Sequence, residues 1–209
     1  MQIAFIGYGE LGVQVHDFLK EKYVSLKPAF FDDELYKANA KDAHPFAYHT
    51  HEDFSKYSFV ICLGYKHAAL KNQLCKQLLA LDRKVLSFVH GSCFVNNSVV
   101  IGEGSIIYPM CNIDKEVKIG NGVLLNNSVV VSHNSAIGDG AYLSPGVVLS
   151  GNVTVGENSF LGAGTVVANG VTIGKNVVVG IGTVVTNNIP DNSFVIGNPM
   201  KFVERLQIN

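Results

Sequence analysis

An aliphatic residue returns every six positions through the second half of the chain. Sixteen hexads follow one another without an insertion. Their aliphatic residues are Val95, Ile101, Ile107, Ile113, Ile119, Leu125, Val131, Ile137, Leu143, Leu149, Val155, Leu161, Val167, Ile173, Val179 and Val185. A six-residue period fits neither a helix nor a meander of strands. It is typical of a parallel β-helix, in which each hexad forms one side of a coil.

A second pattern lies three residues after each aliphatic position. Along the later hexads this position always holds Gly or Asn, which adopt the left-handed αL backbone at a lower cost than other residues. We therefore predict that the chain turns a corner at each of Asn134, Gly140, Gly146, Asn152, Asn158, Gly164, Gly170, Asn176, Gly182 and Asn188.

The first ninety residues show a different order of elements, in which short apolar runs alternate with helical patterns. Strands are expected at residues 2–6, 28–31, 58–63 and 84–89, and helices from the glycine turn Gly7-Tyr8-Gly9-Glu10-Leu11-Gly12 to about Glu21 and from about Ala68 to Leu81. This order predicts an α/β domain, half of a Rossmann fold, over residues 1–90. The β-helix is then expected over residues 91–209.

The glycine turn follows a predicted strand and precedes a predicted helix, which is the context that a G-x-G-x-x-G match requires. Its backbone N–H groups could approach a diphosphate at the helix N-terminus. Asp32 and Asp33, about twenty residues further on, could accept hydrogen bonds from a base or ribose. Because a dinucleotide normally needs two such halves, a nucleotide-linked substrate is favoured over NAD. A structural remnant without a ligand is the remaining alternative.

Composition narrows the function classes. The net charge is −1 and only 16% of residues are charged, which gives no basic surface for nucleic acid. No stretch approaches the ~20 apolar residues of a membrane span, and Met1-Gln2 leads directly into a strand without a signal peptide. The four cysteines show no metal-ligand spacing. We expect a cytoplasmic protein with reduced thiols.

The repeat, as in Ala136-Ile137-Gly138-Asp139-Gly140-Ala141, resembles that of the hexapeptide-repeat acyltransferases. The resemblance implies a left-handed β-helix with three hexads per triangular coil, so that residue n stacks on residue n+18. It also implies a homotrimer with acetyl-CoA in the groove between two subunits.

The combination of a half-Rossmann domain with this β-helix is similar to the sialic acid O-acetyltransferase-like family, which includes N-acetyltransferases of nucleotide-linked 4-aminosugars. The likeness is carried by residues 7–12, Phe31-Asp32-Asp33, residues 132–139 and Gly197-Asn198-Pro199. Gly64-Tyr65-Lys66-His67 most resembles enzymes that acetylate dTDP-linked 4-amino-4,6-dideoxysugars in surface polysaccharide (O-antigen) biosynthesis. The implied substrate-binding residues are Gly7, Gly9, Glu10, Leu11, Asp32, Asp33, Gly64, Tyr65 and Lys66.

His133 is the implied catalytic base, because it lies within the family motif and an imidazole can take the proton that an amine loses on attacking a thioester. Gly151, eighteen residues later, is our candidate N–H donor to the oxyanion. The family often has an acid after the histidine, whereas this chain has Asn134. Asn134 is therefore either a corner residue or a group that orients the imidazole.

The eighteen-residue spacing also predicts columns of small residues that could face a long, thin ligand such as pantetheine. Gly162 would stack on Gly180, and Pro145 on Ala163 and Ile181. By family position, Tyr142, Ala163 and Ile181 correspond to residues that contact acetyl-CoA. The alternative is that the corner glycines only allow the coil to turn.

Two other functions stay open. One is O-acetylation of a sialic-acid-like sugar, and the other is a non-catalytic nucleotide-binding scaffold. A carbonic anhydrase on the same β-helix would need three histidines on zinc, and this β-helix has one of its own, so no metal is expected.

Overall fold

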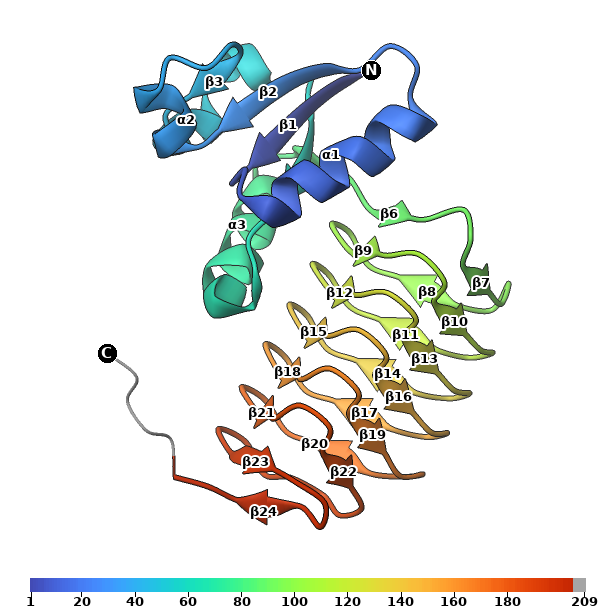
Figure 1. Cartoon of the computed structure of the whole chain (residues 1–209). Coiled ribbons are helices and arrows are strands. Elements are labelled where there is room, and N and C mark those ends of the chain that lie inside the picture. The colour runs from blue at the N-terminus through green and yellow to red at the C-terminus, as the bar shows by residue number, and fades with distance from the viewer. Residues whose placement is uncertain (205–209) are drawn as a thin grey trace. The chain divides into compact units, whose positions relative to one another are not determined.

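A computed structural model describes residues 1–204, which form two compact units. The first unit is Met1–Ser87 and the second begins at Phe88. Figure 1 shows an α/β unit and a stack of short strands. The fold is an N-terminal α/β region followed by a left-handed parallel β-helix, as the sequence and its resemblance predict.

The first unit is built on a parallel five-stranded sheet in the order β3-β2-β1-β4-β5. Its strands are β1 (Gln2–Ile6), β2 (Lys27–Phe31), β3 (Ala43–His44), β4 (Ser58–Ile61) and β5 (Lys84–Val85). Its helices are α1 (Glu10–Lys22), α2 (Asp33–Lys37) and α3 (Ala68–Ala80), with 3₁₀ turns η1 (Phe46–Thr50), η2 (Glu52–Phe54) and η3 (Tyr65–His67). The order of the strands reverses at β1, and in open parallel sheets ligands bind outside the carboxyl ends of the strands at such a reversal.

Apolar side chains on both faces of this sheet form its core. Ile3, Phe5 and Phe59 are fully buried, and α1 contributes Val15 and Leu19. The sequence did not indicate β3, because two residues carry no period.

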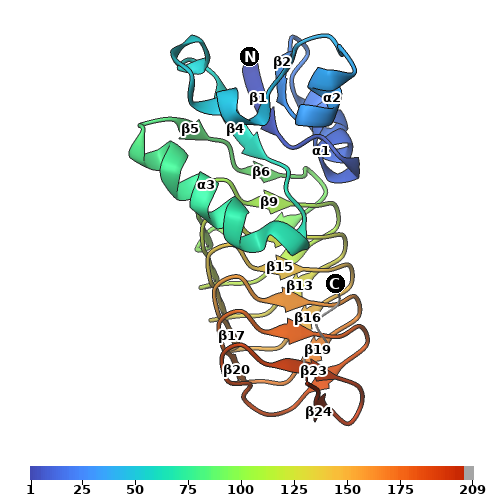
Figure 2. The ribbon, with the colours of Figure 1, turned by 90° about the vertical axis from the view of Figure 1, so that its left-hand side faces the viewer.

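The second unit consists of three parallel sheets, named here by their first strands (Figure 2). The β6 sheet contains β6 (Phe88–Val89), β9 (Ile106–Ile107), β12 (Leu124–Leu125), β15 (Tyr142–Leu143), β18 (Phe160–Leu161), β21 (Val178–Val179), β23 (Phe194–Ile196) and antiparallel β24 (Lys201–Phe202). The β7 sheet contains β7 (Phe94–Val95), β10 (Asn112–Ile113), β13 (Val130–Val131), β16 (Val148–Leu149), β19 (Val166–Val167) and β22 (Val184–Val185). The β8 sheet contains β8 (Val100–Ile101), β11 (Lys118–Ile119), β14 (Ala136–Ile137), β17 (Thr154–Val155) and β20 (Thr172–Ile173).

The predicted eighteen-residue stacking is confirmed. Ile113 pairs with Val131 and Val131 with Leu149, and the other two sheets keep the same offset. The second residue of each two-residue strand points inward, and these aliphatic side chains form one continuous core. Each fully buried aliphatic side chain contributes about 1.5–3 kcal/mol. The strict hexad is therefore enforced by packing.

The corner prediction is confirmed at nine of its ten positions. Asn134 has φ 60°, and the later members have positive φ up to Gly182. The prediction for Asn188 is wrong. Beyond Val185 the offset between coils falls to sixteen residues, as in the pairing of Val179 with Val195. The left-handed residue there is Asn192, whereas Asn188 accepts a hydrogen bond from the N–H of Thr172.

The boundary between the units needs a correction. The single strand expected over 84–89 is two strands, since β5 pairs with β4 in the first unit and β6 pairs with β9 in the β-helix. The repeat thus begins one hexad earlier, at Val89, and the first unit ends at Ser87 rather than residue 90. Because residues 84–89 form one apolar run, the sequence does not show where β5 ends and β6 begins.

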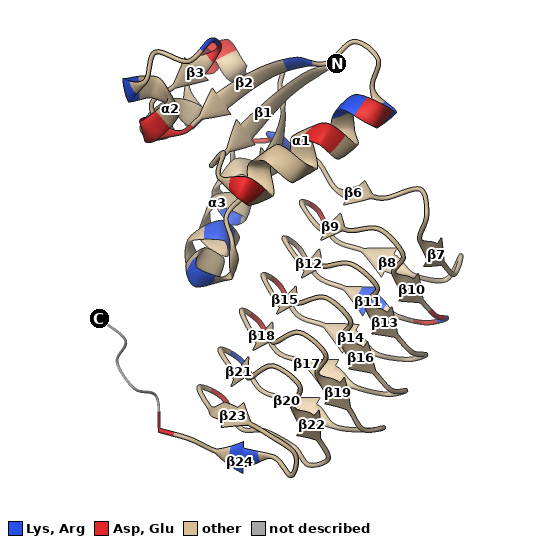
Figure 3. Cartoon of the chain, in the orientation of Figure 1, with Lys and Arg blue, Asp and Glu red and all other residues tan. Residues whose placement is uncertain are grey.

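Each coil has three corners, and their side chains differ. The turns between the β7 and β8 sheets form the histidine corner, here residues 132–135, 150–153 and 168–171. The turns between the β6 and β7 sheets form the proline corner, here 144–147, 162–165 and 180–183. The remaining corner carries Glu103, Asp139 and Glu157, and its charges recur along the stack in Figure 3.

Candidate functional site

The histidine corner places His133 directly after β13, on the turn that Asn134 makes possible. The half-buried imidazole Nδ1 lies 3.0 Å from Oδ1 of Asn134. Since an amide oxygen only accepts hydrogen bonds, Nδ1 carries the proton in the neutral ring and Nε2 keeps its lone pair. Asn134 therefore combines an αL backbone with a side chain that hydrogen-bonds to the imidazole, a geometry that is compatible with both alternatives left open by the sequence.

Gly151 lies under the imidazole, one coil further on. A Cβ at this position would be 2.6 Å from both Cε1 and Nε2 of His133, so only glycine lets the ring lie there. Within residues 1–204, the Gly151 N–H donates no hydrogen bond, although its carbonyl accepts one from Gly170. A buried N–H without a partner is costly unless a ligand oxygen accepts from it.

Asn169, on the next coil, is a site residue that sequence reasoning missed. Its Oδ1 would be 2.9 Å from the same Cβ of Gly151, so the glycine lies between an imidazole and an amide. The spacing of eighteen from Gly151 was the available signal. It was hidden because Asn169 precedes Gly170 and reads as part of a turn.

The proline corner is smooth and uncharged. Pro145, Ala163 and Ile181 are exposed, Ile181 by 78%. Within the described residues the N–H groups of Ala163 and Ile181 donate no hydrogen bond. A ligand with amide oxygens could accept from both along one strip.

The glycines beside this strip are required by packing. A Cβ on Gly162 would lie 2.6 Å from the Ile181 nitrogen, and one on Gly180 would lie 2.4 Å from Cγ2 of Ile196. They allow adjacent coils to come close, which does not depend on a ligand. Tyr142 lies on the outer face of β15, where its hydroxyl accepts a hydrogen bond from Asn126 Nδ2 at 3.1 Å.

The two corners lie at opposite edges of the β7 sheet. Each coil enters this sheet through the proline corner and leaves it through the histidine corner. One chain therefore does not bring His133 together with Ala163 and Ile181. The sheet between them has an apolar outer face, formed by Phe94, Val130, Val148, Val166 and Val184 with one amide, Asn112.

In the first unit, the predicted substrate segments come together. The loops that follow β1, β2 and β4 share the carboxyl edge of the sheet, because these are neighbouring parallel strands. Gly7 has φ 79°, and a Cβ there would lie 2.8 Å from Cδ2 of Leu63. A Cβ on Gly12 would lie 2.8 Å from the Gly7 carbonyl oxygen. Both glycines are needed for the turn itself.

An open groove of about 610 Å³ lies over the start of α1, lined by Tyr8, Gly9, Glu10, Val13 and Gln14. Among residues 1–204, no side chain caps α1, and nothing lies within 4 Å of where a Cβ on Gly9 would be. The first-turn N–H groups, to which Glu10 and Leu11 belong, thus remain for an anion. Among the predicted residues, this is the arrangement most suited to a diphosphate.

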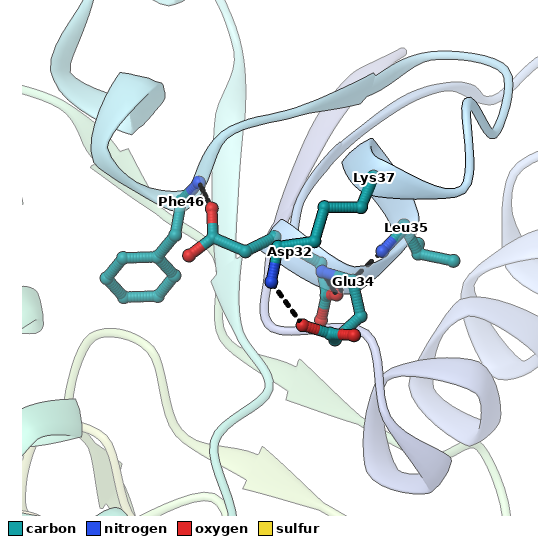
Figure 4. Close-up of polar contacts among 6 residues, drawn as sticks. Asp32, Glu34, Leu35, Lys37 and Phe46 are labelled. Carbon is teal, nitrogen blue, oxygen red and sulfur yellow. Dashed lines mark hydrogen bonds and ion pairs between the residues drawn. The ribbon is translucent and has the colours of Figure 1, made fainter.

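Asp32 and Asp33 differ in what they can still bind. Oδ1 of Asp32 accepts from the N–H groups of Glu34 and Leu35, which caps α2 (Figure 4). Oδ2 of Asp32 accepts from Tyr8 N–H at 2.9 Å. Among residues 1–204, Asp33 accepts only at Oδ1, from the N–H of Phe46. Asp33 therefore has more capacity left for a base or ribose than Asp32.

Tyr8 is fixed within the groove by His16, a contact that the sequence did not reveal. The Tyr8 hydroxyl hydrogen-bonds to His16 Nδ1, and both rings pack on Phe30. Burial raises the pKa of Tyr8 and lowers the pKa of His16, which favours the neutral form of each. The tyrosine thus forms a rigid, uncharged wall.

Gly64, Tyr65 and Lys66 lie after β4 at the same edge. Gly64 precedes η3, and Tyr65 and Lys66 are exposed. Among residues 1–204 no three His, Cys, Asp or Glu side chains are grouped as for a metal ion. No helix in this part of the chain is long and apolar enough to cross a membrane.

Comparisons with known proteins found one matching family and several similar solved structures. Residues 89–190 match the family described as GMPPB C-terminal domain. The acetyltransferase domain of PglB from Neisseria gonorrhoeae is 26% identical with a TM-score of 0.87, covering 97% of this chain and 99% of that one. PerB from Caulobacter crescentus, solved with CoA and GDP-perosamine, is 27% identical with a TM-score of 0.88, covering 97% of each chain. No curated protein matches the chain.

A variant of the Caulobacter GDP-perosamine N-acetyltransferase with one histidine replaced by alanine, also solved with CoA and GDP-perosamine, has the same 27% identity and a TM-score of 0.89. These matches span both units of the chain. They confirm the resemblance to hexapeptide-repeat N-acetyltransferases of nucleotide-linked aminosugars and identify the chain as an acyltransferase.

Proposed function

We propose that the protein transfers the acetyl group of acetyl-CoA to the 4-amino group of a nucleotide-linked 4-amino-4,6-dideoxysugar. The observation that carries this proposal is the position of His133 Nε2 over Gly151 in a chain similar along its length to an enzyme solved with CoA and GDP-perosamine. The dTDP-linked sugar is the expected substrate by the resemblance of residues 64–67, and GDP is its main competitor. We place the reaction in the cytoplasm, in the making of bacterial surface polysaccharide.

His133 acts as general base in this scheme. The neutral sugar amine attacks the thioester carbonyl, a C–N bond forms, and Nε2 takes the proton that the nitrogen loses. The Gly151 N–H donates to the oxyanion of the tetrahedral intermediate. When the intermediate collapses, the C–S bond breaks and the imidazolium returns the proton to the leaving thiolate. Asn134 keeps the proton on Nδ1 throughout.

Each site is built from two copies. The histidine corner of one subunit faces the proline corner of its neighbour, where Tyr142, Ala163 and Ile181 bind acetyl-CoA. The apolar outer face of the β7 sheet, with Phe94 exposed by 58%, supplies the surface that a closed trimer buries. The nucleotide sugar binds at the first unit, with its diphosphate on α1 and its base or ribose on Asp33.

Mixing two inactive variants tests the shared site. His133→Ala removes the base, and Ala163→Asp puts a charge on the proline corner. If each is dissociated and the two are reassembled at equal amounts, about a quarter of the sites combine an intact histidine corner with an intact proline corner. Activity near a quarter of wild type supports a site shared between two subunits, whereas a mixture as inactive as its parents contradicts a shared site.

The reaction itself is tested with a substrate panel. Acetyl-CoA is supplied with dTDP-, GDP- and UDP-linked 4-amino-4,6-dideoxysugars, with the hydroxyl counterpart of each, and with free sialic acid, and thiol release is followed. The His133→Ala protein is the blank, because it carries the same four cysteines. A strong preference for one amine supports the proposal. Acetylation of sialic acid alone favours the O-acetyltransferase alternative, and no release with any acceptor favours a nucleotide-binding scaffold.

A further inference from the structure

Cys93 and Cys111 stand on adjacent coils in the same column of the proline corner. They are eighteen residues apart, and the next residues, Phe94 and Asn112, pair in register. The Phe94 N–H donates to the Cys111 carbonyl at 3.0 Å, so the two cysteines are lateral neighbours in a parallel ladder. Strands in such a ladder lie about 4.8 Å apart. That spacing falls within the Cα separation of a disulfide, roughly 4.4–6.8 Å.

Both thiols are held at this corner by the same contacts. Cys93 Sγ donates to the Tyr108 carbonyl at 3.0 Å, and Cys111 Sγ donates to the Asn126 carbonyl at 3.1 Å. A side-chain contact with Cys111 lowers the pKa of Cys93 to about 7, whereas that contact raises the pKa of Cys111. Cys93 is half-buried and Cys111 is only 1% exposed. The pair thus combines a half-buried thiol, whose pKa is lowered, with a fully buried neighbour.

We propose that Cys93 and Cys111 are a thiol pair that a peroxide oxidises to an intramolecular disulfide joining the first two coils of the β-helix. The Cys93 thiolate attacks a peroxide oxygen, so that an S–O bond forms, the O–O bond breaks and hydroxide leaves as water. Cys111 then attacks the Cys93 sulfur, an S–S bond forms, and the sulfenic oxygen leaves as water with the Cys111 proton. In sum the two thiols lose two electrons and the peroxide becomes two waters.

The other cysteines provide an internal comparison. Cys62 and Cys75 are buried in the first unit, and burial raises the pKa of Cys62 to about 12. We expect them to stay reduced at peroxide concentrations that oxidise the pair, because a thiol reacts as its thiolate.

The repeat indicates matched variants that we expect to fold. At the last position of turns in the other two corners, Ser105, Ser135 and Ser159 donate from Oγ to the carbonyl fifteen residues on, as the two thiols do at the proline corner. Cys93→Ser and Cys111→Ser therefore keep the local hydrogen bond while removing the sulfur.

The experiment exposes the reduced full-length protein to stoichiometric hydrogen peroxide and then digests it without reductant. The expected result is a Cys93–Cys111 linked peptide, a fall from four titratable thiols to two, and reversal by dithiothreitol. In Cys111→Ser, dimedone should instead trap a sulfenic acid on Cys93, and Cys93→Ser should leave Cys111 unmodified. Oxidation of wild-type Cys93 beyond sulfenic acid with Cys111 still titratable would overturn the proposal, as would equal oxidation of Cys62.

Discussion

The histidine corner and the proline corner share one backbone, yet they present opposite chemistry. Both are columns of four-residue turns with a left-handed residue, and both stack at eighteen-residue intervals. The histidine corner carries an imidazole and an amide around Gly151. The proline corner presents Pro145, Ala163 and Ile181, and the N–H groups of the last two donate no hydrogen bond within residues 1–204. A regular coil thus leaves the turn residues free to specialise.

The two corners are suited to two different tasks of a transferase, proton transfer and binding of the cosubstrate. A proton acceptor needs a positioned polar group, whereas a long cosubstrate needs a strip without protruding side chains. Because the β7 sheet lies between the two corners, no rearrangement within a coil can unite them. Association of copies is then part of the catalytic design that we propose.

The largest effect is expected from removing the proposed base, His133, at the histidine corner. His133→Ala should lower turnover by about 10²–10⁴, the usual contribution of a general base, while the half-buried side chain leaves folding intact. Steady-state kinetics measures the turnover, and thermal unfolding measures the stability of the fold. His90→Ala is the control and should keep its activity; equal losses in both variants would show that His133 has no special role.

A smaller loss is expected from Gly151→Ala. The added Cβ would lie 2.6 Å from the His133 ring, which must move away. A displacement of about 1 Å at a catalytic group costs on the order of 10²-fold in rate. Gly91→Ala is the matched control, since its Cβ meets nothing within 4 Å. Unchanged kcat in Gly151→Ala, with a folded protein, contradicts the stacking of base and oxyanion donor.

The sequence was sufficient for the β-helix because its period is imposed by a continuous core. Val131 and Leu149 must face inward at fixed intervals, so the pattern is visible without any long-range information. The prediction from sequence failed where a strand changes its packing partner but the composition stays the same. This happens at β5 and β6 and after Val185. Those breaks depend on which sheet a strand joins.

For the site, the sequence indicated single residues better than pairs. His133 and Gly151 follow from the motif and the spacing, and their contact is seen in the structure. Asn169 and the thiol pair follow the same eighteen-residue rule but resemble turn and core residues. The hydrogen bonds that occupy Asp32 depend on the fold of α2 and could not be read from the Asp-Asp sequence.

Variants of Asn134 can separate its role in turning the chain from its role in orienting the His133 imidazole. Asn134→Gly keeps the αL backbone, φ 60°, but removes the hydrogen bond to His133 Nδ1. We expect unchanged stability and a loss of about 10-fold in kcat, the lower end of the 10–100-fold range known for groups that orient metal-ligating histidines. Asn134→Ala should show that loss and also be about 1–2 kcal/mol less stable. Wild-type kcat in Asn134→Gly leaves only the turning role.

The smallest effect tests the corners themselves, apart from catalysis. Met110 is a left-handed residue at the proline corner, with φ 62° and a side chain 69% exposed, whereas Gly and Asn hold most left-handed positions over the three corners of the β-helix. Met110→Asn should stabilise the chain by about 1 kcal/mol, because Asn adopts αL with less strain and no buried contact is lost. Met110→Ala is the control, since alanine keeps the Cβ strain and should gain nothing. Chemical denaturation measures both, and equal midpoints for Asn and Ala would mean that conformational strain does not govern residue choice at this corner.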